Sequence, residues 1–138
     1  MKKLIGLIII AGLGVVVVGA IIAFYKELVY LTFDEESATV AKIPTRQMNL
    51  LLITLAAFTV AVAIPIVGVL LIAALVVIPV ITALQFKKSF LQTIVIAELV
   101  SLFSVLIGII ISFYFSLSSG GTIVIIAILI FLLSLMIK

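Results

Sequence analysis

The stretch that decides the fold is LLLITLAAFTVAVAIPIVGVLLIAALVVIPVITAL, residues 50–84, which contains no charged side chain. As a single helix it would be about 52 Å long at about 1.5 Å per residue, but the hydrocarbon core of a bilayer is about 30 Å thick. Pro65 disfavours continuation of a helix, and Gly68 permits a tight turn. The stretch therefore predicts a helical hairpin, with spans at 49–64 and 66–85 and a kink at Pro79.

The rest of the chain has the same apolar character. The 138 residues are 67% hydrophobic and 9% charged, and the mean hydropathy is +1.71. Soluble domains are about 45–50% apolar and about 25% charged, so a soluble enzyme, a disordered tail and a nucleic-acid-binding domain are excluded. Apolar runs at 4–25, 90–115 and 122–137 predict three further spans, and the polar cluster 116–122, with Gly120 and Gly121, predicts a turn before the last one. The first run is too long for a signal-peptide core of about 7–15 residues, so it is interpreted as a span.

These spans predict one all-α transmembrane domain over residues 1–138, a bundle of about five helices in the cell membrane (plasma or inner). The sequence contains neither Cys nor His. It therefore offers no thiolate nucleophile and lacks the commonest transition-metal ligand and general base. It also lacks a phosphate-binding loop of the G-x-x-x-x-G-K-[ST] type. We expect no catalytic residue, no metal-ligating site, no cofactor and no nucleic-acid partner.

The distribution of basic residues predicts the orientation. With five spans and the loop 26–47 in the cytoplasm, Lys2 and Lys3 lie outside and the other six basic residues lie inside. These six are Lys26, Lys42, Arg46, Lys87, Lys88 and Lys138. The excess of six against two follows the positive-inside rule. The outside N-terminus with two lysines is expected where the first helix continues from earlier spans that this chain lacks.

The loop 26–47 is the one long polar stretch, and it holds four of the five acidic residues: Glu27, Asp34, Glu35 and Glu36. Thr32 or Asp34 is suited to cap a helix, and acids favour its first turn. The loop therefore predicts a short interfacial helix of roughly two turns, ended by Pro44, with Phe33, Ala38 and Ala41 as non-polar contacts. Two interpretations stay open: a solvated connector and a docking helix for a cytoplasmic partner. The three adjacent carboxylates point in different directions on a helix, so they do not predict a metal site.

The span 90–115 carries the only acid within an apolar run, Glu98. A carboxylate in a bilayer costs several kcal/mol unless it is paired, protonated or hydrated, which makes Glu98 a functional candidate. It lies roughly 12 Å along the helix from Phe90, near the predicted cytoplasmic end. Reaching the interface or Lys87 and Lys88 is the simpler role, and its function stays open.

The same span carries small residues within an arc of about 80°, which predicts a close-packing face for another helix. They are Ala97, Ser101, Ser104, Gly108 and Ser112. Glu98 lies on the flank of this face.

Three ordered blocks resemble the metal-ion ABC transporter permeases, the zinc, manganese and iron uptake family. LTFDEESATVAKIPTR, residues 31–46, is similar to the coupling segment of that family, with Phe33, Asp34, Glu36 and Ala38 matching. VGVLLIAALVVIPVITAL, residues 67–84, is similar to its most recognisable helix, with Gly68, Pro79 and Ala83 in place, and residues 106–135 resemble its last two helices. The resemblance covers the C-terminal half only. It implies a fragment, one piece of a split gene, or a decayed copy that lacks about four spans.

The resemblance implies a membrane-spanning permease component of an ATP-driven metal-ion uptake transporter. It assigns ATPase coupling to the segment Phe33, Asp34, Glu35, Glu36 and Ala38. Its implied partners are an ABC ATPase subunit, the missing N-terminal half or a second permease subunit, an extracytoplasmic metal-binding protein and the lipid membrane. The chain departs from the family pattern at Lys42, where Gly is usual, and at Ser116 and Ser118, where Asp and Pro are frequent.

Two other functions stay open at this point. One is a small oligomeric ion-coupled carrier or channel that uses Glu98, and the other is a membrane accessory subunit without a pathway of its own. The resemblance does not choose among zinc, manganese and iron.

Overall fold

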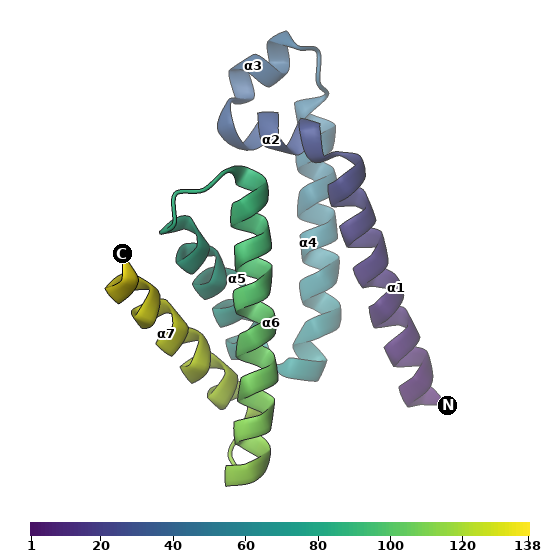
Figure 1. Cartoon of the computed structure of the whole chain (residues 1–138). Coiled ribbons are helices and arrows are strands. Elements are labelled where there is room, and N and C mark those ends of the chain that lie inside the picture. The colour runs from purple at the N-terminus through teal and green to yellow at the C-terminus, as the bar shows by residue number, and fades with distance from the viewer. The chain divides into compact units, whose positions relative to one another are not determined.

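A computed structural model describes the backbone of residues 1–138 and the side chains of all residues except Glu35, Ala38 and Thr39. The described backbone forms seven helices and no strand (Figure 1). The helices are α1 (Lys2–Ala23), α2 (Tyr25–Phe33), α3 (Glu35–Val40), α4 (Thr45–Val67), α5 (Val69–Leu84), α6 (Phe90–Phe115) and α7 (Ser119–Ile137).

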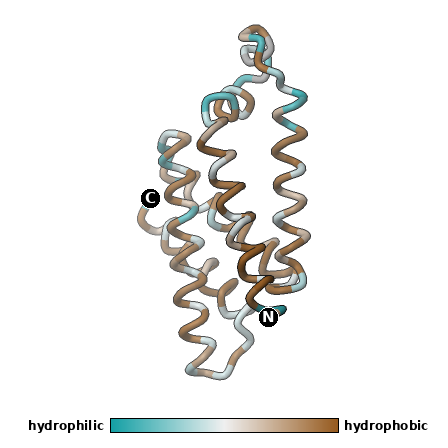
Figure 2. The backbone as a smooth tube through the Cα atoms, turned by 90° about the vertical axis from the view of Figure 1, so that its right-hand side faces the viewer, coloured by the Kyte–Doolittle hydropathy of each residue, from teal (hydrophilic) through white to brown (hydrophobic). Residues whose placement is uncertain are grey.

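Four helices, α1, α4, α6 and α7, are long and apolar enough to cross a membrane, and α5 is apolar but shorter, with 16 residues. Figure 2 shows hydrophobic residues along most of the length of the long helices. The predicted all-α membrane fold class is confirmed. The chain divides into two compact units, Met1–Val62 and Ala63–Lys138, each described separately below.

In the first unit, the polar stretch is more helical than the sequence predicts. One short helix was expected between 26 and 47, but α2 precedes α3 and contacts both α1 and α3. The side chain of Leu28 is buried. Tyr25, three residues earlier, and Val29, one residue later, are half-buried. This spacing places apolar side chains on one face of a helix. The polar residues Lys26, Glu27 and Thr32 of the same helix give the segment a loop-like composition.

The interruption of the long apolar stretch lies at Gly68, not at Pro65. Helix α4 continues through Pro65 to Val67, and Gly68 alone separates it from α5. Gly68 has φ 86°, a conformation that residues with a Cβ rarely adopt. The Gly68 N–H donates to Ile64 O at 2.9 Å, and Gly68 O accepts from the Ile72 N–H at 3.3 Å. Proline removes one hydrogen bond from a helix, whereas the positive φ at Gly68 changes the direction of the chain, and this explains where the break lies.

In the second unit, α5, α6 and α7 pack against one another in all three pairs. The buried core consists largely of small side chains: Ala83, Ser104 and Ala127 are 0% exposed and Thr82 is 1% exposed. The two most deeply buried hydroxyls, those of Thr82 and Ser104, bond within their own helices. Thr82 Oγ1 donates to Ile78 O and Ser104 Oγ donates to Val100 O, each at 2.7 Å. Small, internally satisfied side chains let helix backbones approach closely, which is the usual way in which membrane helices associate.

The turn between α6 and α7 lies at Ser116–Ser118, the first part of the predicted turn 116–122, and is shorter than predicted. Ser116 has φ 52°, and its N–H and that of Leu117 both bond to Ser112 O, which is a common helix ending. Gly120 and Gly121 therefore belong to the first turn of α7 rather than to the turn itself. Ser118 is the N-terminal flanking residue of α7, and its carbonyl accepts from the Thr122 hydroxyl at 2.8 Å.

Candidate functional site

The exposed polar segment α2–α3 is organised around Asp34. Its N–H donates to Tyr30 O at 2.9 Å and so completes the last turn of α2. Its Oδ1 accepts from the Ser37 N–H at 3.0 Å, and its Oδ2 accepts from the Ser37 hydroxyl. Carboxylate capping of the third helical N–H satisfies a donor that a helix start leaves unpaired. Of the two predicted caps, Asp34 therefore takes this role, whereas Thr32 donates back to Leu28 O at 2.8 Å.

The pKa of Asp34 is lowered from its ordinary value of 3.8, first by the hydrogen bond from the Ser37 hydroxyl and then by the Ser37 N–H. The ionised Asp34 side chain therefore stabilises the folded state. This stabilisation is fully present above the ordinary pKa, and it is lost as the pH falls through the lowered pKa of the folded state. We therefore expect amide exchange in α3, corrected for its intrinsic rate, to show unchanged protection from pH 7 to pH 5. Protection should fall only in strong acid.

The matched variant is Asp34→Asn, because Asn also caps helices but does not titrate. It should retain protection of the α3 amides in strong acid. A loss of α3 protection between pH 7 and pH 5 in the unmodified chain would show that another group controls this helix.

Other residues of the predicted coupling segment surround this cap. Phe33, the last residue of α2, has 69% of its side chain exposed, and Glu36 in the first turn of α3 is also exposed. The side chains of Glu35 and Ala38 lie outside the described set, although both residues belong to the α3 backbone. The structure thus places Phe33, Asp34 and Glu36 together at the junction of two short helices.

Lys42 follows α3 in a left-handed conformation, with φ 59°. Helices commonly end with one residue in this conformation, usually Gly, because a Cβ makes it costly. The departure from the family pattern noted at Lys42 therefore falls at a position where the backbone itself favours glycine.

On α6, the predicted small-residue face is buried towards the C-terminal end of the helix. Ser104, Gly108 and Ser112 are buried, and Ala97 and Ser101 are half-buried. A Cβ added to Gly108 would lie 2.5 Å from Ile123 Cγ1 and 2.7 Å from Ile123 Cα, so α7 packs directly on this residue. Of all the glycines, Gly108 is the one at which an added Cβ would come closest to another residue.

Glu98 and Pro79 differ in their surroundings. Glu98 is exposed on the surface of α6, whereas Pro79 is among the largest fully buried side chains described. Among the described residues, no group of three or more His, Cys, Asp or Glu side chains is arranged to hold a metal ion.

The chain has several apolar helices of membrane length. It also has an exposed polar segment, α2–α3, in which the carboxylate of Asp34 caps the second helix. These features define a multi-pass membrane protein. Residues 4–138 match the model of a protein family described as the ABC 3 transport family. The chain belongs to this family. The resemblance read from residues 31–46, 67–84 and 106–135 is thereby confirmed.

Named relatives support the same conclusion. The chain is 33% identical over 125 residues to a "Probable metal transport system membrane protein" of Treponema pallidum, covering 91% of this chain and 47% of the relative. It is 33% identical over 129 residues to the "High-affinity zinc uptake system membrane protein ZnuB" of Haemophilus influenzae, covering 93% and 49%. The chain spans about half the length of the curated relatives it matches, in their C-terminal part.

A solved structure shares the fold. It is "PsaBC from Streptococcus pneumoniae in complex with Fab", which matches with a TM-score of 0.88 at 28% sequence identity. The match covers 94% of this chain and 47% of that chain.

Proposed function

We propose that the chain is a membrane-spanning permease component of an ATP-driven metal-ion uptake transporter. The observation that carries the proposal is the exposed α2–α3 junction, because its cap residue Asp34 and the exposed Phe33 belong to the stretch that resembles the family's coupling segment. The names of the relatives, which include metal and zinc transport systems, support the substrate class.

In this proposal the α2–α3 segment faces the cytoplasm and docks on an ABC ATPase, a separate subunit that hydrolyses ATP. Asp34 ends α2 and caps α3, so in this proposal a movement that the ATPase imposes on one of these helices reaches the other through this residue. The remaining half of the permease, or a second permease subunit, lines the pathway together with this chain. An extracytoplasmic metal-binding protein delivers the ion, which is the substrate.

Co-purification and reconstitution test the proposal. The tagged chain, expressed with the ATPase and the remaining permease segments, should retain both after detergent extraction. Vesicles containing the complex should take up zinc, manganese or iron only with ATP. Uptake by the chain alone, driven by an ion gradient and without an ATPase, would support the carrier alternative and contradict this proposal.

The orientation gives a separate prediction. We expect the N-terminus outside, the C-terminus inside and residues 26–47 in the cytoplasm, because six basic residues against two are then inside. In sealed cells a membrane-impermeant thiol reagent should label Ser118→Cys but not Thr39→Cys. The native chain contains no cysteine, so the background is clean. Labelling of Thr39→Cys from outside would show that residues 26–47 face the outside and that the predicted orientation is wrong.

Glu98 gives a third prediction. The residue is exposed and lies on the flank of the buried Ser104–Gly108 face, near the predicted cytoplasmic end of α6. We expect Glu98→Gln to leave metal uptake by the reconstituted complex within about threefold of the unmodified protein. A loss greater than tenfold with normal assembly would assign the carboxylate a role in transport and would favour the ion-coupled alternative.

A further inference from the structure

The three-helix unit 63–138 carries all its basic residues at one end. Helices α5 and α7 end there and α6 begins there, because the connection 85–89 joins α5 to α6 and residue 138 follows α7. Lys87, Lys88 and Lys138 are the basic residues of this unit, and Glu98 within α6 is its one acid. Lysines at helix ends serve to orient spans in a membrane, but two of these three also line a pocket.

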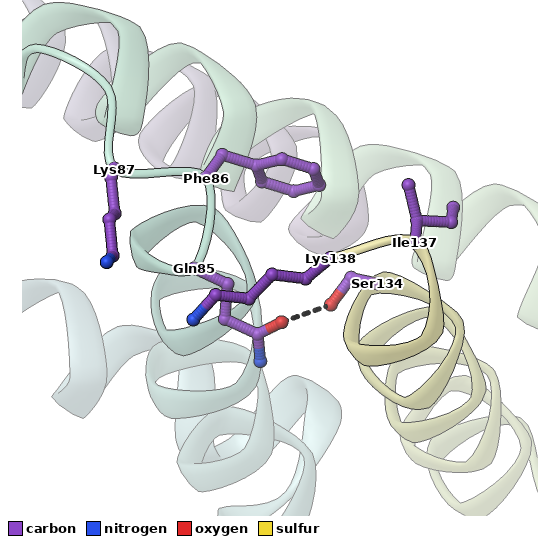
Figure 3. A pocket seen from close by; sticks show the side chains of 6 residues that line it. All are labelled: Gln85, Phe86, Lys87, Ser134, Ile137 and Lys138. Carbon is purple, nitrogen blue, oxygen red and sulfur yellow. Dashed lines mark hydrogen bonds between the residues drawn. The ribbon is translucent and has the colours of Figure 1, made fainter.

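The pocket has a volume of about 290 Å³ and lies between the ends of α5 and α7 (Figure 3). It is lined by Gln85, Phe86, Lys87, Ser134, Ile137 and Lys138. Ligand pockets usually measure about 300–1,000 Å³, so this one suits a small group rather than a large cofactor.

Four of the six lining residues are polar: Gln85, Lys87, Ser134 and Lys138. Gln85 Oε1 lies 2.9 Å from the buried Ser134 hydroxyl, which is also 2.7 Å from Phe131 O. The amide nitrogen of Gln85 points away from Ser134, and the side chain of Lys138 extends from the end of α7 towards Gln85 (Figure 3). Amide N–H and ammonium groups donate hydrogen bonds, and an ammonium group accepts none. The chemistry that matches this lining is an anion with several acceptor oxygens.

Lys87 adopts a left-handed conformation, with φ 48°. Glycine is the default residue in that region, because a Cβ makes it costly. Here, as at Lys42 after α3, the left-handed residue follows the end of a helix, in this case α5. A lysine at this position places a charge at the pocket that glycine would not supply.

The other lining residues are apolar. Phe86 is 41% exposed and Ile137 is 77% exposed, and both continue the apolar surfaces of α5 and α7. A ligand with an anionic head and an apolar body matches both parts of the lining. From these observations we propose that the pocket binds the phosphate of an anionic phospholipid headgroup. A terminal carboxylate at residue 138 would offset one of the two lysine charges that line the pocket and leave one.

The test compares lipid binding by the purified full chain in detergent, measured by native mass spectrometry with phosphatidylglycerol or phosphatidylcholine added. Each lysine near a membrane surface contributes about fivefold to binding of anionic lipid. The Lys87→Gln/Lys138→Gln pair should therefore bind phosphatidylglycerol roughly 25-fold more weakly, and its binding of phosphatidylcholine should be unchanged. The Lys87→Arg/Lys138→Arg pair should retain binding.

The matched control is Lys2→Gln/Lys3→Gln, which removes the same charge from the start of α1, at residues that do not line the pocket. Equal weakening in this control would show general charge attraction and overturn the proposal. An unmodified chain with no preference for phosphatidylglycerol would overturn it without reference to any variant. Complete displacement of the lipid by millimolar inorganic phosphate would identify a soluble anion as the ligand instead.

Discussion

Replacing Phe33 by Ala is expected to separate ATP hydrolysis from metal transport and to release the ATPase during purification. Phe33 is 69% exposed at the end of α2, next to the cap formed by Asp34. Exposed aromatic anchors often carry about 2 kcal/mol or more of a small interface, which corresponds to roughly 30-fold in affinity. Ala38→Leu should act in the same direction, because the resemblance places a small residue where the ATPase approaches closely.

The matched control is Tyr30→Ala, which removes another exposed aromatic side chain from the same helix but lies outside the matching stretch. It should retain the ATPase and transport. The prediction is contradicted if both Phe33→Ala and Ala38→Leu retain the ATPase in a pull-down and show normal metal uptake. Residues 31–46 would then be a plain connector. Membrane insertion is the parallel check, since neither residue belongs to a membrane-length helix.

Replacing Gly108 by Ala is expected to force α6 and α7 apart. The new Cβ would lie 2.7 Å from Ile123 Cα and 3.0 Å from Ile123 N, as well as 2.5 Å from its Cγ1. A side-chain atom can rotate away, but the backbone of Ile123 moves only if α7 moves. Overpacking of this kind typically lowers the free energy of unfolding by about 1–3 kcal/mol. In mixed detergent micelles, the variant should therefore reach its unfolding midpoint at a lower denaturant concentration than the unmodified chain.

Gly121→Ala is the control for this prediction. Gly121 also lies in α7, and a Cβ there would meet nothing within 4 Å. Its midpoint should stay close to that of the unmodified chain. Equal stability of the two variants would mean that α6 and α7 do not depend on close contact at Gly108.

Much of this structure is predictable from the sequence, because membrane spans and caps depend on local residue chemistry. The span predicted at 90–115 has the same bounds as α6, and the residues predicted as its small face include the buried Ser104, Gly108 and Ser112. Asp34 was one of two candidate caps because its side-chain oxygens can accept from the first N–H groups of a helix. In each of these cases the deciding residues lie within one helix or one turn.

What the sequence did not predict depends on backbone angles or on residues far apart in the chain. Pro65 is the more obvious helix breaker, but the break requires the positive φ that Gly68 adopts. Helix α2 was missed because Lys26 and Glu27 hide the spacing of its apolar face. The pocket at Gln85 and Ser134 joins residues 49 positions apart, which no local pattern reports.

The length of α5 has a consequence for the surrounding bilayer. Its 16 residues extend about 24 Å at about 1.5 Å per residue, about 6 Å less than a typical hydrocarbon core. A bilayer meets such hydrophobic mismatch by thinning locally, while flanking lysines such as Lys87 and Lys88 stretch to reach the polar interface. Wherever α5 borders lipid, the acyl chains beside it are compressed. Lipids with shorter acyl chains therefore pack next to α5 with the least deformation of the bilayer.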